Sequence, residues 1–293
     1  MTRFKRCGGF MKGTDVLVLG GSGTGKTHYA GQLLGRMRHD RSSRLRVRLG
    51  GVDDLSKLEE ILTCLEEGQA AGHTPAETWT GIRCELETDD GTAVVLEWPE
   101  YAGERLFAIV DHRMMPDEWR ESARSASGWL LFIRPSTLKL YEDLLVRPTD
   151  VKPQHSDSPV AIVDGAGWDD RARYVELLQM FLFAAGQSTC EPIEVPRLAV
   201  VFSCWDELNG AQSTPERLLA ERLPLLNAFI RSTWRDEAWS AWGLSSLGRA
   251  LRNDEPDQEF RTLGPENFGY VLRPGATTQD RDLTSPVAWL LGV

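Results

Sequence analysis

The residues best suited to chemistry lie close together near the start of the chain, in the run GGSGTGKT at positions 20–27. This run matches the pattern GxxxxGK[ST] in full, after a short apolar segment and before a helix-forming one, as the pattern requires. Its glycines let backbone N–H groups turn toward phosphate oxygens, and the following helix adds its positive dipole end. We therefore expect a triphosphate to bind here. The predicted contacts are Gly21, Ser22, Gly23, Thr24, Gly25, Lys26, Thr27 and His28.

Two side chains of this loop have separate expected roles. Lys26 would bring a positive charge to the β- and γ-phosphates, and the Thr27 hydroxyl would ligate Mg²⁺. The alternative is a glycine-rich turn that binds no ligand. Because several classes of nucleotide-binding protein share such a loop, the nucleotide has to be identified from other residues.

A second segment with chemical potential follows a predicted β-hairpin. Two strand-like runs within 82–98 are separated by Asp-Gly, which is a strong hairpin signal. The next residues, EYAGE at 100–104, resemble the motif DxxG with glutamate in place of aspartate. Glu100 would accept hydrogen bonds from Mg²⁺-bound water, and Gly103 would offer its N–H to the γ-phosphate. Glu97 is the alternative acid.

A candidate base-reading site follows the buried strand expected at 197–203. The residues Ser203-Cys204-Trp205-Asp206 resemble the motif NKxD, with only the aspartate retained. The carboxylate of Asp206 can accept both N1–H and N2–H of guanine, which adenine cannot match. Trp205 could cover the base in place of the missing lysine, whereas the alternative for Asp206 is a helix cap. Farther along, Ser245 and Ser246 stand in a loop that resembles the guanine-supporting SA motif.

In this order the motifs resemble those of a Ras-like GTPase enlarged by insertions. The forms LEWPEYAGE, FSCWDEL, GLSSLG and DLTSPVAWLL are similar to those of the bacterial double-GTPase family, and the resemblance runs from about Thr14 to the end. It implies a switch that binds GTP or GDP with Mg²⁺ and controls a protein partner in bacterial conflict or defence systems. It also implies a Mg²⁺-binding switch threonine within HTPAETWTG, for which Thr78 is our choice and Thr74 and Thr80 are alternatives.

Hydrolysis would need a polar residue that orients water in line with the γ-phosphate. Glu104 stands where Ras-like enzymes often have glutamine, so it is the candidate beside Lys26, with a purely structural role as the alternative. The adjacent Arg105 could offset its charge or lie on the surface. Since the sequence assigns no arginine finger, we expect slow turnover that a partner accelerates. Two other classes stay open: an ATP-dependent enzyme, and an interaction module that binds nucleotide without hydrolysis.

These motifs have to be positioned by alternating strands and helices. Apolar or alternating runs predict strands at 15–19, 45–49, 129–133, 197–203 and 239–244, and helical spacing predicts helices at 28–37, 54–67, 116–126, 138–146, 170–185, 215–234 and from 285. The expected fold is α/β, a three-layer P-loop NTPase with a mostly parallel sheet and one antiparallel hairpin strand. We expect a basic extension at 1–13 and one domain at 14–293, with insertions at about 40–75 and 135–168.

Composition limits the partners. The chain has 293 residues, 33 basic and 43 acidic, for a net charge of −10. This balance disfavours general attraction to nucleic acid or anionic lipid. No apolar run approaches the ~18 residues of a membrane span, and the N-terminus lacks a secretion signal, so we expect a cytoplasmic protein. The five cysteines are scattered, which indicates reduced thiols, and the ten tryptophans are expected to serve the core.

Overall fold

The structure is a computed structural model that describes residues 16–39, 44–52, 56–72, 80–88, 91, 93–100, 103–140, 169–208 and 213–293. The expected N-terminal extension, the loop at 147–168, and the candidate switch residues Thr74 and Thr78 lie outside these ranges. The predicted domain limits and insertions stay predictions.

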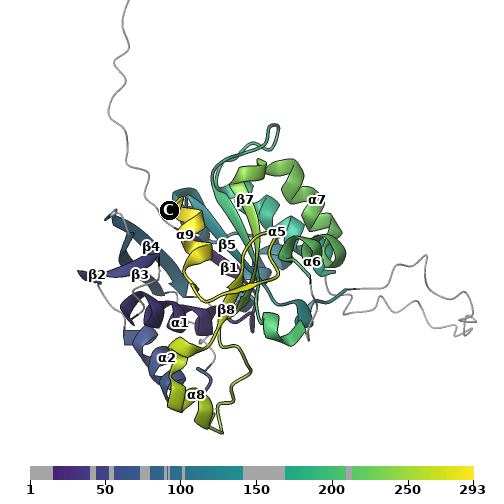
Figure 1. Cartoon of the computed structure of the whole chain (residues 1–293). Coiled ribbons are helices and arrows are strands. Elements are labelled where there is room, and N and C mark those ends of the chain that lie inside the picture. Colours follow the sequence, from purple (N-terminus) through teal and green to yellow (C-terminus); the bar gives the residue numbers. More distant parts are fainter. Residues whose placement is uncertain are drawn as a thin grey trace, which may run out of the picture.

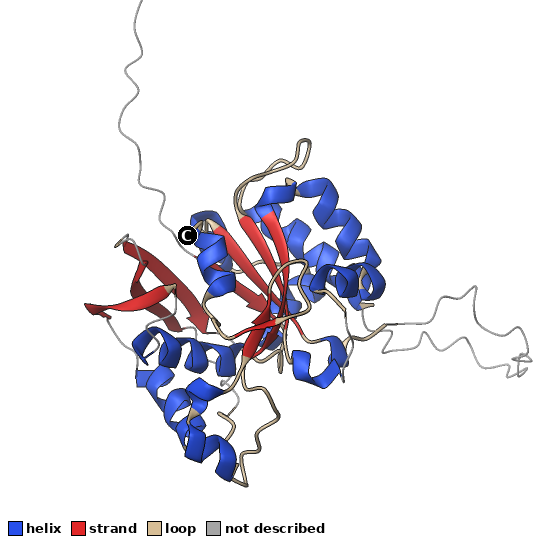
Figure 2. Cartoon of the chain, in the orientation of Figure 1, coloured by secondary structure: helices blue, strands red, loops and turns tan. Residues whose placement is uncertain are grey.

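A six-stranded sheet forms the centre of the molecule (Figures 1 and 2). Its first four strands are parallel, and the last two run antiparallel to their neighbours. The order is β1 (Val16–Gly20), β5 (Gly128–Ile133), β6 (Arg197–Phe202), β7 (Trp239–Ser245), β8 (Tyr270–Leu272) and β9 (Gln279–Asp280). Strands β1, β5 and β7 are buried along their whole length, which explains their nearly continuous apolar sequences.

Helices cover both faces of this sheet, so the fold has the three layers that the sequence predicts. Alternate residues of one strand serve opposite layers: Leu17 and Leu19 belong to one core cluster, Val16 and Val18 to the other. The first layer contains α3 (Gly103–His112), α4 (Asp117–Ser125), α5 (Asp170–Ala184), α6 (Pro215–Arg222) and α7 (Pro224–Thr233). The second contains α1 (Lys26–His39), α2 (Ser56–Glu66) and α9 (Ser285–Leu291).

The predicted hairpin is present as β3 (Thr80–Thr88) and β4 (Ala93–Glu100). Hydrogen bonding places it in a separate antiparallel sheet with β2 (Leu45–Val52), which Figure 2 shows beside the large sheet. Within the described ranges, no ladder joins this small sheet to β1. Leu86 and Leu96 nevertheless pack into the same core cluster as α1, so the hairpin is anchored by apolar contact.

Two helix predictions are wrong in detail. The single helix expected at 215–234 is broken into α6 and α7 at Leu223. Pro224 has no N–H to donate and disfavours the helical region for the residue before it, and Leu223 accordingly has φ −130° and ψ 58°. At 138–146, the described residues 138–140 are not helical and follow a short 3-10 turn, Pro135–Thr137; the rest of that prediction lies outside the described residues.

Three short elements near the C-terminus were not predicted. They are α8 (Gln258–Leu263), β8 and β9, which are too short to show a clear hydrophobic period. A search of the described residues finds no helix long and apolar enough to cross a membrane.

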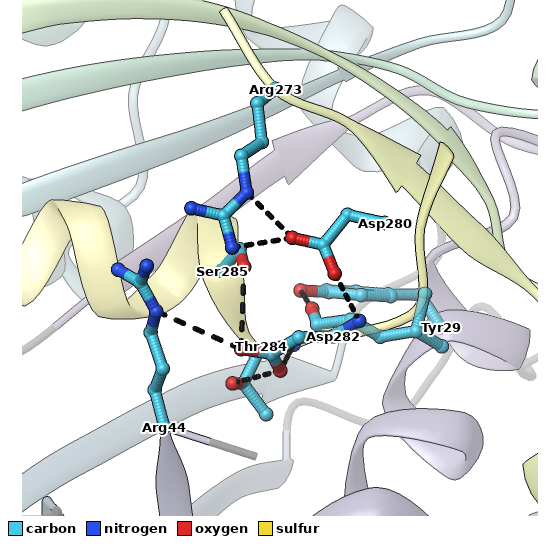
Figure 3. A network of polar contacts seen from close by, with 8 residues as sticks. Tyr29, Arg44, Arg273, Asp280, Asp282, Thr284 and Ser285 are labelled. Carbon is cyan, nitrogen blue, oxygen red and sulfur yellow. Dashed lines mark hydrogen bonds and ion pairs between the residues drawn. The ribbon is translucent and has the colours of Figure 1, made fainter. Parts of the chain in front are cut away.

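A polar network fastens the C-terminal helix α9 to the helix that follows the phosphate loop (Figure 3). The Tyr29 hydroxyl in α1 donates to the Leu283 carbonyl at 2.7 Å. Just before α9, the Asp282 carboxylate accepts the Thr284 backbone N–H at 3.0 Å and the Ser285 hydroxyl at 3.3 Å. The first residues of the terminal motif DLTSPVAWLL therefore order the start of α9 and hold it against α1.

Candidate functional site

The loop at 20–27 leaves β1 and enters α1, as its sequence requires. Gly23 and Gly25 have φ of +68° and +75°, values that L side chains rarely adopt. The Thr24 hydroxyl is buried and donates to the Gly21 carbonyl at 2.9 Å, which closes the loop on itself. Glycine is therefore required at these two positions, because the backbone conformation that turns N–H groups inward has positive φ there.

Lys26 lies folded over this loop. Its ammonium donates to the Gly20 and Gly21 carbonyls at 2.7 and 2.6 Å. The ammonium also donates to the Thr24 hydroxyl, at 3.3 Å. A phosphate would offer this ammonium charged acceptors, which form hydrogen bonds about twice as strong as neutral carbonyls do.

Gly103 places the start of α3 directly against the phosphate loop. A Cβ at this position would lie 2.1 Å from the Gly21 carbonyl carbon and 2.1 Å from the Ser22 nitrogen. Only glycine permits such a close approach of two backbones. A second close contact joins the same two segments, because a Cβ at Gly21 would lie 2.6 Å from the Phe107 ring of α3. The segment that resembles DxxG therefore abuts the predicted phosphate site.

The acidic candidates lie at this junction. Glu100 is the last residue of β4, and Glu104 is the second residue of α3. Their side chains, like that of Glu97, fall outside the described part of the structure. Thr80, the one alternative switch threonine within the described ranges, begins β3 opposite Glu100 in the strand register.

Asp206 lies in a 3-10 turn, Trp205–Leu208, directly after β6. It is inside that turn rather than before it, so the helix-cap alternative does not describe it. The Ser245 hydroxyl at the end of β7 donates to the Asp206 Oδ1 and accepts the Gly248 N–H at 3.0 Å. Ser245 is fully buried, and its hydrogen bond orients Asp206. Of the two predicted serines, Ser246 is the one in the cavity lining.

Trp205 does not cover the predicted base site. Its ring is buried in the first core layer and packs so tightly on β7 that a Cβ at Gly243 would lie 2.8 Å from it. Cys204, which stands where NKxD has lysine, faces the cavity instead, with φ of +51°. Burial raises the pKa of its thiol to about 11, so the thiol is neutral near pH 7.

One cavity of about 380 Å³ joins most of these residues. The carboxyl ends of adjacent parallel strands meet at one edge of a sheet, which is where α/β folds bind ligands. The phosphate loop and the turn after β6 both line this cavity. Of the predicted site residues, its lining includes Ser22, Gly23, Thr24, Gly25, Lys26, Thr27, His28, Gly103, Asp206 and Ser246.

Sequence reasoning missed an arginine in this lining. Arg134 is the first residue after β5, and its guanidinium Nη1 donates to the Gly23 carbonyl at 3.0 Å. The Nε donates to Glu207 Oε2 at 3.0 Å, and Nη2 also donates to the Glu207 carboxylate. These hydrogen bonds raise the pKa of Arg134 and lower the pKa of Glu207. The one available signal was a basic residue at the end of a buried strand.

The segment after α2 was missed as well. The Ala71 N–H donates to the His28 Nε2 at 3.1 Å, which brings Ala71 and Gly72 into the cavity wall. His28, expected to contact phosphate, thus has its imidazole committed in part to this wall. No local pattern marks such a contact, since the two residues are far apart in sequence.

Comparison with known proteins gives a family for the chain. The sequence model of the family DO-GTPase1, Double-GTPase 1, matches residues 17–290. No curated protein matches the chain.

Solved structures also match the chain, at low sequence identity. The bacterial selenocysteine-specific elongation factor EF-Sec has 14% identity over 80% of this chain and 26% of its own, with a TM-score of 0.34. The signal recognition particle receptor SRb-GTP/SRX complex from Chaetomium thermophilum has 12% identity over 87% and 98%, with a TM-score of 0.40. Roco2 RocCORdC of Methanosarcina barkeri bound to GDP has 12% identity over 80% and 44%, with a TM-score of 0.30. This chain thus spans less than half of two of them. Because the family model covers most of the sequence, the chain belongs to the Double-GTPase 1 family.

Proposed function

We propose that this protein is a GTP-binding switch that hydrolyses GTP slowly and acts on a protein partner. Membership of a GTPase family supports the binding of GTP and GDP. The observation that carries the proposal is a cavity lined by both the phosphate loop and Asp206. Its volume of about 380 Å³ is within the range of small-molecule sites.

In this proposal the phosphates occupy the loop. The inward N–H groups and the start of α1 bind phosphate oxygens, and Lys26 exchanges its loop carbonyls for the β- and γ-phosphates. Gly103, whose backbone abuts Gly21 and Ser22, offers its N–H to the γ-phosphate.

Guanine is selected by Asp206, which the buried Ser245 hydroxyl holds in place. The carboxylate accepts the two donors on the guanine edge. Adenine has a ring acceptor in place of N1–H and a C–H group in place of the N2 amine, so it loses both hydrogen bonds and places a lone pair against the carboxylate. Each hydrogen bond to a charged group contributes about 1.5–3 kcal/mol. We therefore expect guanine to be preferred by about 100-fold or more.

A Mg²⁺ ion fits the available donors. Within the described residues, no group of three His, Cys, Asp or Glu side chains could hold a metal by itself. Mg²⁺ in nucleotide sites is usually held by one or two protein oxygens together with phosphates and water. The Thr27 hydroxyl in the cavity wall supplies such an oxygen, and we assign Glu100 as the second. Bound there, Mg²⁺ would offset the charge of the phosphates.

Hydrolysis and switching both involve the junction of β4 and α3. We assign Glu104 to orient the attacking water and Thr78 to be the switch threonine that binds Mg²⁺. Because the start of α3 contacts the phosphate loop so closely, loss of the γ-phosphate would release the junction and change the surface around the hairpin. The partner that reads this surface belongs, by the resemblance of the motifs, to bacterial conflict or defence systems.

The test measures thermal stabilisation by GTP, GDP and ATP, each with Mg²⁺. At 100 times its Kd a ligand adds about 2.7 kcal/mol, which raises the Tm of a protein of this size by roughly 5–10 °C. We expect this rise with GTP and GDP only, and its loss for every nucleotide in Lys26→Ala. Equal stabilisation by ATP in the wild type would reject guanine selectivity.

The Asp206→Asn variant separates base reading from folding. Its GDP affinity should fall about 100-fold, because an amide cannot accept two donors. Xanthosine diphosphate has a carbonyl in place of the N2 amine, so the amide can donate to it and this ligand should bind the variant better than the wild type. The exposed Asp236 provides the matched control, and Asp236→Asn should behave as the wild type.

A further inference from the structure

The position of Arg134 points to a role that the recognised motifs do not assign. Its guanidinium spans from the phosphate loop, where it contacts the Gly23 carbonyl, to Glu207, the residue next to Asp206. Strands β5 and β6, which precede Arg134 and Glu207, are parallel neighbours in the sheet. Arg134 therefore links the phosphate loop to the turn that carries Asp206.

The guanidinium is held in a fixed plane. Two of its nitrogens bind the Glu207 carboxylate, and a third binds the Gly23 carbonyl at 3.0 Å. The Ser136 hydroxyl also donates to Glu207, which orients the carboxylate from the other side. A planar fork bound at three points loses little further freedom when a ligand arrives. About one third of the Arg134 side chain is exposed, at 31%, and the residue lines the cavity, so part of the side chain is accessible to a ligand there.

The residues expected to cover the base do not do so here. The lysine of NKxD is replaced by Cys204, and Trp205 is buried in the core. Gly23, Arg134, Glu207 and Asp206 line the same cavity. A nucleotide with its phosphates in the loop and its base at Asp206 would therefore lie beside the guanidinium, which is bonded to both Gly23 and Glu207.

We propose that Arg134 covers the guanosine part of the bound nucleotide, with Glu207 and Ser136 as the residues that position it. This inference rests on the proposed function. Since Glu207 neutralises the arginine, attraction to phosphate is a small part of its effect, and its planar face is what it offers. Guanidinium planes pack favourably on purine rings. The lysine missing from one loop is thus replaced by an arginine from the neighbouring strand.

The test compares GDP with inorganic pyrophosphate, a ligand that has phosphates but no base or ribose. Affinities for both, with Mg²⁺, are measured by calorimetry or displacement for the wild type, Arg134→Ala, Arg134→Lys and Glu207→Gln. For Arg134→Ala we expect GDP binding to weaken about tenfold while pyrophosphate binding stays within twofold. Arg134→Lys should also bind GDP more weakly than the wild type, because an ammonium has no planar face.

The control is Arg217→Ala, which removes an arginine of an exposed ion pair with Glu221 on α6; it should leave both affinities unchanged. Unchanged GDP affinity in Arg134→Ala would overturn the inference. Equal losses for GDP and pyrophosphate would also overturn it, because Arg134 would then act only by ordering the phosphate loop. If Arg134→Ala fails to fold, Glu207→Gln decides, with an expected threefold to fivefold loss for GDP alone. A wild type that binds no GDP would instead reject the proposed function itself.

Discussion

Replacing Gly103 by alanine tests whether the start of α3 sets the shape of the phosphate loop. The added Cβ would lie 2.1 Å from the Gly21 carbonyl carbon and from the Ser22 nitrogen, and 2.4 Å from the Gly21 oxygen. Favourable contacts between such atoms lie near 3.5 Å, so the loop or the helix start must move by roughly 1 Å. All three obstacles are backbone atoms, so no side-chain rotation can relieve the clash.

This displacement should weaken nucleotide binding strongly. A misplacement of about 1 Å in a positioned site can cost roughly 100-fold, and 100-fold in Kd corresponds to about 2.7 kcal/mol. We therefore expect the Kd for GDP to rise about 100-fold in Gly103→Ala. Overpacking of this kind should also lower the free energy of unfolding by about 1–3 kcal/mol.

The assay is calorimetric titration with GDP and Mg²⁺ at a temperature where both proteins are folded, as checked by circular dichroism. Gly35→Ala is the matched control, because a Cβ there meets only the flexible end of Leu62, at 3.2 Å, outside the cavity. Its GDP affinity should equal that of the wild type, and its Tm should be unchanged or higher, since glycine inside a helix costs about 1 kcal/mol relative to alanine. A folded Gly103→Ala protein that binds GDP as tightly as the wild type would refute the reasoning.

Three further outcomes are expected. Ser245→Ala removes the hydroxyl that orients Asp206, so the ratio of GDP to ADP affinity should fall about tenfold; an unchanged ratio in competition assays would contradict this. Tyr29→Phe leaves the buried Leu283 carbonyl without its donor and should cost about 1 kcal/mol, seen as a Tm roughly 2–4 °C lower, whereas an equal Tm would show that the network is dispensable. Cys204, whose pKa burial raises to about 11, should stay protonated at pH 8 and be alkylated more slowly than the exposed Cys190, with the rate rising as pH approaches 11. Peptide mapping by mass spectrometry measures both rates, and equal rates at pH 8 would contradict the burial of Cys204.

Much of the fold could be predicted because its signals are local. The apolar run before Gly20, the loop and the helix after it follow one another in sequence, so a single motif describes them. The strands β5 and β7 are buried along their whole length, and β6 is buried after its first residue, Arg197, so they read as mostly apolar runs. The hairpin was visible from its Asp-Gly turn, and even the break at Pro224 was readable, since proline interrupts a helical pattern.

The sequence did not show that the hairpin belongs to a separate sheet. A hydrophobic period shows which face of a strand is buried, but it does not show which strand is its neighbour. The pairing of β3 with β2 joins strands that pack into the same core cluster as α1 and α2. Propensity alone contains no such information.

At the site, the sequence by itself indicated the phosphate loop, because the hydrogen bonds of Thr24 and Lys26 to the Gly20 and Gly21 carbonyls join residues of one short run. Only the tertiary structure decided that Gly103 abuts this loop, that Ser245 holds Asp206, that Trp205 is core and that Arg134 bridges the cavity. The last three of these facts depend on which strand ends become neighbours at one edge of the large sheet, and the first depends on how the small sheet packs beside it. Such neighbours are joined by long crossovers, so their meeting leaves no spacing in the sequence to be read.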